Sequence, residues 1–252
     1  MEQNKIGRVH LLDELRGAAI ILMVCYHAGY DLVAIFGVDM PFFYSAQLNL
    51  IRDIMAGAFI FISGCSCRLS HSNLRRGLQT LLLAMGMTAA TWLVIPEQII
   101  RFGVLHCLGC CMLLFALLER GLDRVKPFPG ALLAGVAFYL TFTLPSGVFG
   151  GLTYRFLLPR GLYDCGFLFP LGFPSPQFFS SDYYPLLPWF FLFLCGAYIG
   201  VYIREGRFPA GAYRLHCRPL AFVGRHTLWV YLCHQPILFG ALSLIFYLAG
   251  RG

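Results

Sequence analysis

Long apolar stretches recur along the whole chain, separated by shorter segments that contain arginine, glycine and proline. A hydrophobic run of about 17 to 25 residues is long enough to cross a bilayer as an α-helix, because each helical residue adds about 1.5 Å. The pattern therefore predicts an all-α, polytopic integral membrane bundle with about seven transmembrane helices. The predicted spans lie at 17–36, 48–66, 78–95, 102–118, 131–144, 183–203 and 220–249.

The first and last spans have features of their own. The first is longer than the apolar region of a signal peptide, and no small-residue cleavage site follows it, so we expect it to be retained. The last contains Pro236, which lacks a backbone N–H and should kink or break the helix. No repeat of about 20 to 50 residues and no linker rich in glycine and serine divides the sequence. This favours a single integral-membrane domain over residues 1–252.

The composition excludes the soluble classes of protein. Hydrophobic residues make up 58% of the chain and charged residues 12%, against about 25% charged residues in a typical soluble domain. A cytosolic enzyme, a disordered chain and a secreted disulfide scaffold are therefore disfavoured. Most of the ten cysteines fall in predicted helices, where free cysteine packs as a small apolar residue. We expect the Cys107-x-x-Cys110 pair to pack in the same way, with zinc or redox chemistry as the alternative, and we predict no metal site.

The net charge of +7 is unevenly distributed along the sequence. If the N-terminus lies inside, 14 of the 19 basic residues fall on the inner side of the membrane. The cytoplasmic loops of membrane proteins carry an excess of lysine and arginine. The distribution therefore predicts a cytoplasmic N-terminus and an external C-terminus. The residues predicted on the outer side are Arg101, Arg155, Arg160 and Arg251.

Two histidines lie near the middle of predicted spans, where ionisable side chains are costly and usually mark a site. His27 lies about 15 Å from the start of the first span, and Asp31 lies one turn further on the same helix face. A carboxylate there can accept a proton from one imidazole nitrogen and raise the basicity of the other, as a general base requires. His234 lies at mid-depth in the last span, followed by Gln235 and Pro236. The alternative for these residues is a structural hydrogen bond between helices.

A second group of polar and aromatic residues lies towards the outer ends of the predicted spans. It could form an outer vestibule that binds a substrate, or its members could be separate interfacial anchors. Arg52 and Asp53 are neighbours in sequence and should point to different helix faces, so each is expected to need a partner elsewhere. The candidate substrate-binding residues are Arg52, Asp53, Arg101, His106, Asp182, Trp189 and Gln235.

Arginines flank the inner ends of several spans, and most of them are expected to act only as topology signals. Arg16 differs because it borders the helix that carries His27, and a guanidinium there can bind a phosphate or pyrophosphate through two hydrogen bonds. Arg225 flanks another inner end. His226 lies on about the same helix face as His234, but nearer to the inner surface. Arg16, Arg225 and His226 are therefore candidates for binding the phosphates of a cytosolic donor.

Five segments together resemble integral-membrane acyltransferases. The segment LDELRGAAI at 12–20, followed by His27, is similar to the opening motif of bacterial O-acyltransferases that modify surface polysaccharides. It also resembles the catalytic domain of heparan-α-glucosaminide N-acetyltransferase, and four further segments favour this second family. They are FISGCS at 61–66, GVLHCLG at 103–109, DYYPLLPW at 182–189 and GRHTLWVYLCHQP at 224–236.

The resemblance implies an enzyme that moves an acyl group, usually acetyl, from acyl-CoA to a sugar amine or hydroxyl across the membrane. In the bacterial O-acyltransferases the histidine at the position of His27 is the expected catalytic residue, and the arginine at the position of Arg16 is also required. The heparan-type enzyme instead has an asparagine at the position of His27. Its catalytic histidine comes further along, where this chain has Val38 and Asp39.

We therefore expect an acyl-CoA-dependent transmembrane acetyltransferase in the bacterial inner (cytoplasmic) membrane. Acetyl-CoA would be the donor and an envelope glycan the acceptor, with membrane lipid around the protein, no nucleic acid and no metal; a homodimer is left open. His27 would act as base or acyl carrier, with Asp31 and His234 beside it. The main alternative is a proton-coupled transporter of a small anionic or sugar-like solute, which also uses mid-membrane histidines but usually has an internal repeat. An inert assembly subunit would not explain the buried histidines.

Overall fold

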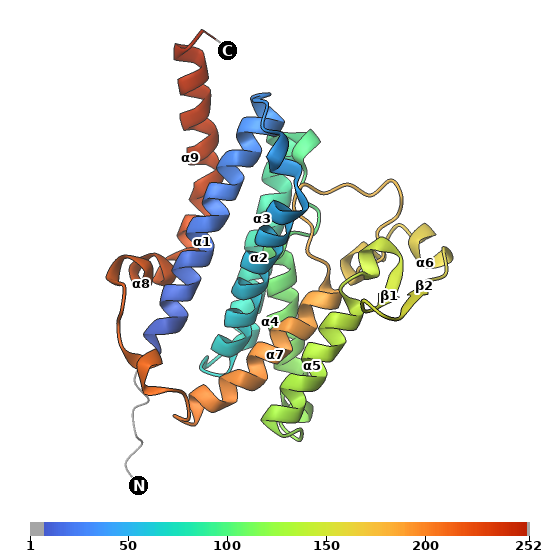
Figure 1. The fold of residues 1–252 in the computed structure, drawn as a ribbon, viewed down its shortest axis with the longest axis vertical. Coiled ribbons are helices and arrows are strands. Elements are labelled where there is room, and N and C mark those ends of the chain that lie inside the picture. The colour runs from blue at the N-terminus through green and yellow to red at the C-terminus, as the bar shows by residue number, and fades with distance from the viewer. Residues whose placement is uncertain (1–7, 251–252) are drawn as a thin grey trace. The chain divides into compact units, whose positions relative to one another are not determined.

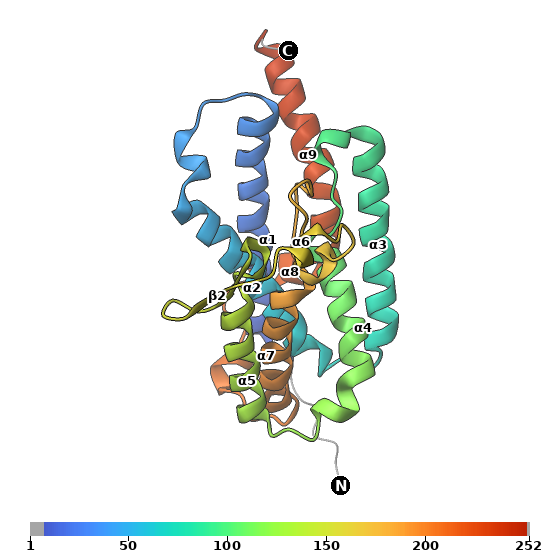
Figure 2. The same cartoon turned by 90° about the vertical axis from the view of Figure 1, so that its right-hand side faces the viewer.

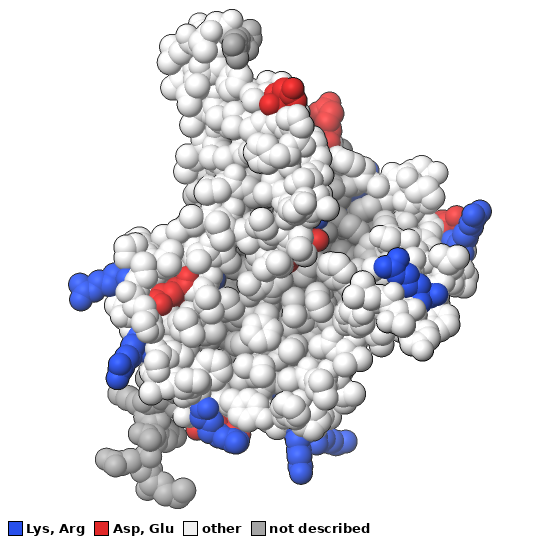
Figure 3. Space-filling model, viewed as in Figure 1, with Lys and Arg blue, Asp and Glu red and all other residues white. Residues whose placement is uncertain are grey.

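The computed structural model describes residues 8–250, so Arg251, predicted on the outer side, and Lys5, one of the 14 basic residues predicted on the inner side, lie outside the described residues. The described chain is mostly helical, with 72% helix and 3% strand. Seven of its helices are long and apolar enough to cross a membrane, which confirms the predicted membrane bundle. Figure 3 shows that charged side chains are few on the visible face. The seven helical segments are His10–Ile35, Ala46–Cys67, Asn73–Val94, Val104–Leu122, Pro127–Ser146, Leu186–Arg204 and Thr227–Leu248.

The described residues fold into two compact units (Figure 1). Unit 1 combines residues 8–59 with 208–250, and unit 2 comprises residues 60–207. The elements of unit 1 are α1 (His10–Tyr30), the π-helix η1 (Asp31–Ile35), the 3-10 helix η2 (Pro41–Tyr44), the first part of α2 (Ala46–Cys67), the 3-10 helix η6 (Ala210–Tyr213), α8 (Arg218–Arg225) and α9 (Thr227–Leu248).

Helices α1 and α8 of unit 1 cross with their backbones in contact, and Figure 1 shows α8 lying across α1. A Cβ on Gly17 would fall 2.0 Å from the carbonyl oxygen of Leu220. A Cβ on Gly224 would fall 1.7 Å from the carbonyl oxygen of Asp13. Both distances are far below van der Waals contact, so the crossing requires glycine on each helix.

The last predicted span, 220–249, is two helices instead of one. Helix α8 ends at Arg225, His226 leaves the helical conformation, and α9 begins at Thr227. The His226 ring nitrogen Nδ1 lies 2.8 Å from the Phe222 carbonyl oxygen, which the His226 N–H would bond in a continuing helix. Pro236 was expected to kink or break the helix, and α9 continues through this proline without a break. Prolines are tolerated in membrane helices because neighbouring groups can bond the backbone atoms that the proline leaves without a partner.

Unit 2 is built from two pairs of packed helices, α3 with α4 and α5 with α7, which lie side by side in Figure 2. Small residues again permit close approach, since a Cβ on Gly64 would fall 2.0 Å from the Phe193 carbonyl oxygen. The elements of unit 2 after the end of α2 are α3 (Asn73–Val94), the 3-10 helix η3 (Pro96–Gln98), α4 (Val104–Leu122), α5 (Pro127–Thr141), the 3-10 helix η4 (Leu144–Ser146), β1 (Val148–Gly150), β2 (Arg155–Leu157), α6 (Gly161–Asp164), the 3-10 helix η5 (Phe169–Leu171) and α7 (Leu186–Arg204).

Arg68 connects three helices of unit 2 at the end of α2. Its side chain is 1% exposed and pairs with the Asp123 carboxylate at 2.5 Å. The Nε–H donates to the Ala197 carbonyl oxygen at 3.2 Å, and the guanidinium lies 4.8 Å from the centre of the Phe115 ring. The sequence identified Arg68 only as a marker of the inner side, whereas the structure uses its charge to hold α2, α4 and α7 together.

The segment between α5 and α7 contains the strands of the fold. Strands β1 and β2 pair antiparallel, with Val148 opposite Leu157 and Gly150 opposite Arg155. The Tyr183 hydroxyl donates to the Phe169 carbonyl oxygen at 2.6 Å, and burial raises the pKa of this phenol above its ordinary value. The prediction of an all-α fold holds for the membrane helices, and the short antiparallel pair β1–β2 lies outside them.

Candidate functional site

The two mid-span histidines of the sequence analysis face each other in unit 1. His27 projects from α1 and His234 from α9, and their ring centres are 5.0 Å apart at an interplanar angle of 55°. His234 is buried, whereas His27 is partly exposed. Two imidazoles at this separation can both contact one small reacting group.

The hydrogen bond of His234 to the backbone determines which of its nitrogens carries the proton. Nδ1 lies 2.6 Å from the Tyr231 carbonyl oxygen. A carbonyl oxygen can only accept, so Nδ1 must donate its hydrogen. In the neutral ring Nε2 then carries a lone pair, as a proton acceptor requires. Nε2 is buried and has no hydrogen-bond partner within residues 8–250.

Asp31 and Gln235 form the second polar contact between the same two segments. Gln235 Nε2 donates to Asp31 Oδ1 at 2.6 Å. The one-turn spacing suggested that Asp31 would bond His27, but the hydrogen bond that its carboxylate makes is to Gln235. At Asp31 the backbone changes from α to π geometry, with the Phe36 N–H bonding the Asp31 carbonyl oxygen at 3.0 Å. Such π turns are often found at functional sites.

Three buried polar atoms on these side chains have no hydrogen-bond partner within the described part of the chain. They are Asp31 Oδ2, Gln235 Oε1 and His234 Nε2. Buried polar atoms in proteins are nearly always hydrogen-bonded. Gln235 Oε1 and His234 Nε2 are acceptors, and so is Asp31 Oδ2 when the carboxyl is ionised. The arrangement is therefore suited to a ligand with several O–H or N–H donors.

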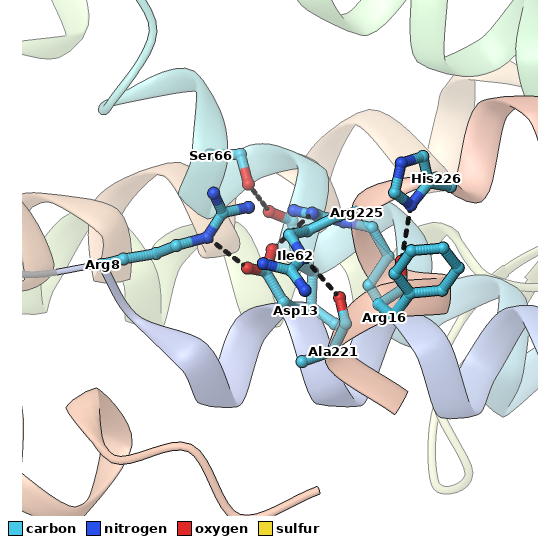
Figure 4. A network of polar contacts seen from close by, with 9 residues as sticks. Arg8, Asp13, Arg16, Ile62, Ser66, Ala221, Arg225 and His226 are labelled. Atoms are coloured by element: carbon cyan, nitrogen blue, oxygen red, sulfur yellow. Dashed lines mark hydrogen bonds and ion pairs between the residues drawn. The ribbon is translucent and has the colours of Figure 1, made fainter. Parts of the chain in front are cut away.

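A cluster of cations lies at the crossing of α1 and α8, and it is organised by a buried carboxylate. Asp13 accepts from Arg8 Nε at 2.6 Å and from Arg16 Nη1 at 3.3 Å (Figure 4). Across the crossing, Arg225 is held by its Nε–H, which donates to the Ala221 carbonyl oxygen at 3.1 Å. Arg225 and the next residue, His226, are both exposed. The cations of the cluster are Arg8 and Arg16, which bond Asp13, and Arg225 across the crossing; His226 follows Arg225 in the chain.

Asp13 and Glu14 were not among the candidate residues predicted from the sequence, although both are buried in α1. The signal was present, because two carboxylates precede Arg16 in the first turns of an apolar helix. Buried carboxylates require charged or N–H partners. Asp13 finds them in Arg8 and Arg16, and Glu14 finds them in the segment that leads into α8.

Arg52 and Asp53 form an ion pair with each other, which their spacing did not predict. Each was expected to need a partner elsewhere, because neighbouring residues point to different helix faces. Arg52 Nη2 lies 2.8 Å from Asp53 Oδ1, and its Nε also donates to this oxygen at 2.9 Å. The long arginine side chain can reach back to its neighbour, which short side chains could not do.

His106 and Asp182 meet at the first turn of α4 in unit 2, where both make structural hydrogen bonds. Asp182 Oδ2 accepts from the Val104 N–H at 2.9 Å, as the cap of α4. His106 Nδ1 accepts from the Gly103 N–H at 3.3 Å, and Nε2 lies 3.2 Å from Thr88 Oγ1. Because Nδ1 accepts, Nε2 carries the hydrogen of the neutral ring and donates to Thr88. The ring is therefore occupied at both nitrogens.

The other two candidates in unit 2 also have local partners. The Arg101 N–H donates to Ser180 Oγ at 3.0 Å, and its guanidinium lies 5.9 Å from the centre of the Phe178 ring. Trp189 is 6% exposed and packs between Phe138 and Tyr184 in an aromatic cluster. These contacts suit a packed structural region better than an open vestibule.

The described residues contain no group of three or more His, Cys, Asp or Glu side chains that could hold a metal ion. The side chains described above can provide proton transfer, hydrogen bonding and anion binding. Histidine pairs, buried carboxylate–amide contacts and arginine clusters supply these three functions in turn.

Comparison with curated proteins and with solved structures finds no significant match. A sequence model of one family, heparan-alpha-glucosaminide N-acetyltransferase, catalytic, matches residues 8–236. The match includes both histidines, the Asp31–Gln235 contact and the cation cluster, and it covers more than half of the sequence. The chain therefore belongs to the heparan-alpha-glucosaminide N-acetyltransferase catalytic family.

Proposed function

We propose that this protein transfers an acetyl group from cytosolic acetyl-CoA to an amine or hydroxyl of a sugar in an envelope glycan. Membership of the family implies a membrane acetyltransferase. The observation that carries the proposal is the His27–His234 pair, with a proton-accepting nitrogen of His234 buried between two apolar helices. A transmembrane enzyme needs such a base at depth, where water does not supply one.

The chemistry proposed at the pair is acyl transfer with one proton moved. The acceptor nitrogen or oxygen attacks the thioester carbonyl, a C–N or C–O bond forms, and the C–S bond breaks. The acceptor's proton passes to a histidine and then to the leaving thiolate of CoA. His234 Nε2 is already poised to take a proton, and His27 is the second reacting group, as base or as transient acyl carrier.

The nature of the acceptor is supported by the unpartnered atoms around the pair. A ligand there needs hydrogen-bond donors for three buried atoms, which are Asp31 Oδ2, Gln235 Oε1 and His234 Nε2. A sugar provides several O–H groups, and an amino sugar adds N–H donors. The Asp31–Gln235 contact is therefore proposed to orient the acceptor while the histidines carry out proton transfer.

The cation cluster is proposed as the site for the phosphates of CoA. Arg8, Arg16, Arg225 and His226 are grouped at the α1–α8 crossing, and arginine binds phosphate through two parallel hydrogen bonds. Asp13 holds two of these arginines. We place the cluster at the cytoplasmic side, since the basic residues predict a cytoplasmic N-terminus. The whole chain would then act as one domain in the bacterial cytoplasmic membrane.

The decisive experiment uses the full chain in lipid nanodiscs with radiolabelled acetyl-CoA. Glucosamine and N-acetylglucosamine form a matched pair of acceptors, because the second has its amine blocked. Transfer to glucosamine alone indicates N-acetylation, and transfer to both indicates O-acetylation. The His27→Ala variant should lose about 10²–10⁴ in rate, as expected for loss of a positioned base. His71→Ala removes an exposed loop histidine and is the matched control.

The donor site is tested with acetyl-pantetheine, which carries the thioester but lacks the nucleotide phosphates. Arg16→Ala should raise the KM for acetyl-CoA, because the variant loses a contact to the phosphates of CoA. The KM for acetyl-pantetheine should stay unchanged, because this donor has no phosphates. Arg75→Ala, at an exposed arginine, is the control. No transfer from either thioester to any sugar, together with solute uptake by proteoliposomes, would overturn the enzyme in favour of a transporter.

A further inference from the structure

A buried carboxylate of α1, that of Glu14, contacts the backbone at the N-terminus of α8. Glu14 is 6% exposed, and its Oε1 accepts from the backbone N–H groups of His216 at 2.6 Å and Cys217 at 2.9 Å. Its other oxygen, Oε2, lies 3.5 Å from His216 Nδ1. Both oxygens of Glu14 are therefore directed at the two residues that precede α8.

Helix α8 needs such an external contact. It has eight residues, and helices shorter than about 12 to 15 residues are marginal on their own. The first N–H groups of a helix have no partner within it, and its N-terminus attracts negative charge. Cys217, at the N-cap position, makes no side-chain capping bond. From the neighbouring helix, Glu14 supplies an acceptor for the N–H groups of the two residues that lead into α8, and a negative charge at the N-terminus of this helix.

The other attachment of α8 to α1 is the glycine crossing. Gly17 follows Arg16 directly, and Gly224 precedes Arg225. The crossing sets how closely the helices approach at Leu220 and Gly224, and another contact is needed to fix the start of α8, which precedes both residues. The bonds of Glu14 to residues 216 and 217 do so.

We infer that Glu14 is a positioning residue that fixes α8 against α1 and thereby places Arg225 and His226 beside Arg16 for phosphate binding. The inference rests on the proposed function of the cation cluster. Glu14 does not contact the ligand, because its oxygens are used by the start of α8. The charged and titratable groups near Glu14 are Arg8 before α1, Asp13 and Arg16 on α1, and His216 and Cys217 before α8.

Hydrogen–deuterium exchange tests the positioning without any ligand. In Glu14→Ala the amides of residues 216–225 should exchange faster than in the wild-type chain, while those of α9 should keep their protection. Glu14→Gln keeps a carbonyl oxygen at the position of Oε1, so it should restore most of the protection. Glu205→Ala removes an exposed carboxylate of unit 2 and should leave exchange at 216–225 unchanged. Unchanged exchange in Glu14→Ala would overturn the inference.

Calorimetric titration with CoA then tests the consequence. Loss of two hydrogen bonds to a charged group should weaken CoA binding by about tenfold or more in Glu14→Ala, with recovery in Glu14→Gln. The kcat at saturating acetyl-CoA should change little, whereas a general loss of folded protein would lower it. Faster exchange with unchanged CoA affinity would overturn the positioning role. A wild-type chain that binds no CoA would overturn the donor site itself, and exchange in Glu14→Ala would still decide whether Glu14 holds α8.

Discussion

Gly17 of α1 and Gly224 of α8 lie directly against each other, since a Cβ on either would fall 3.0 Å from the backbone nitrogen of the other. Arg16 and Arg225 are the chain neighbours of these two glycines. The crossing therefore determines where the cations of the proposed donor site lie. A basic residue at a helix end is common in membrane proteins, and we propose that these two residues, brought together by a glycine contact, form a binding surface for phosphate.

Gly224→Ala should separate α1 from α8. The added methyl would fall 1.7 Å from the Asp13 carbonyl oxygen, and forced overpacking of this kind typically costs about 1–3 kcal/mol. We expect a lower melting temperature and weaker CoA binding by calorimetry. Gly240→Ala, on α9 with nothing within 4 Å of the new methyl, is the matched control and should keep both properties. Wild-type CoA affinity in Gly224→Ala would show that the crossing does not set the donor site.

His234→Asn should lower kcat by about 10²–10⁴, because asparagine cannot take up a proton at the position of Nε2. The asparagine amide can still donate to the Tyr231 carbonyl oxygen, so the fold should survive. Steady-state kinetics with acetyl-CoA and glucosamine would measure the effect, with melting temperature as a check on folding. A folded variant with wild-type kcat would exclude His234 as the base.

Gln235→Leu should destabilise the protein by leaving the Asp31 carboxylate buried without its amide donor. An unsatisfied buried polar group costs about 1–3 kcal/mol, and more when it is charged. The double variant Asp31→Leu with Gln235→Leu should recover much of this stability, because neither polar partner remains. Chemical unfolding in detergent would compare the two variants.

The same pair of variants separates stability from function. If Asp31 and Gln235 orient the acceptor, the double variant should be stable but have a raised KM for the sugar. A double variant that is both stable and fully active would show that the contact is only structural.

His106→Leu should reduce stability and leave chemistry intact. The substitution removes the acceptor of the Gly103 N–H and the donor to Thr88, at about 1–3 kcal/mol. The variant should melt at a lower temperature, and the kcat of the folded fraction should stay near the wild-type value. A variant that melts at the wild-type temperature but no longer acetylates the sugar would indicate that His106 binds the acceptor.

The sequence was enough to predict which residues form the candidate site, but not which of them contact each other. His27 and His234 stood out because an ionisable group at membrane depth is costly wherever the chain folds. Their 5.0 Å approach was not visible, because it depends on how α9 returns beside α1. The partner of Asp31 was also unpredictable: helical spacing pointed to His27, but a residue 204 positions away provides the donor.

The sequence by itself determined the seven apolar helices, the family and the residues with costly charges. These follow from composition and local periodicity, since burial in lipid selects long hydrophobic runs regardless of their order in space. Only the tertiary structure decided that Arg52 pairs with Asp53, that the last span is interrupted at His226, and that Glu14 caps α8. Each of these depends on side-chain reach or on contacts between distant segments, and residue spacing does not encode those distances.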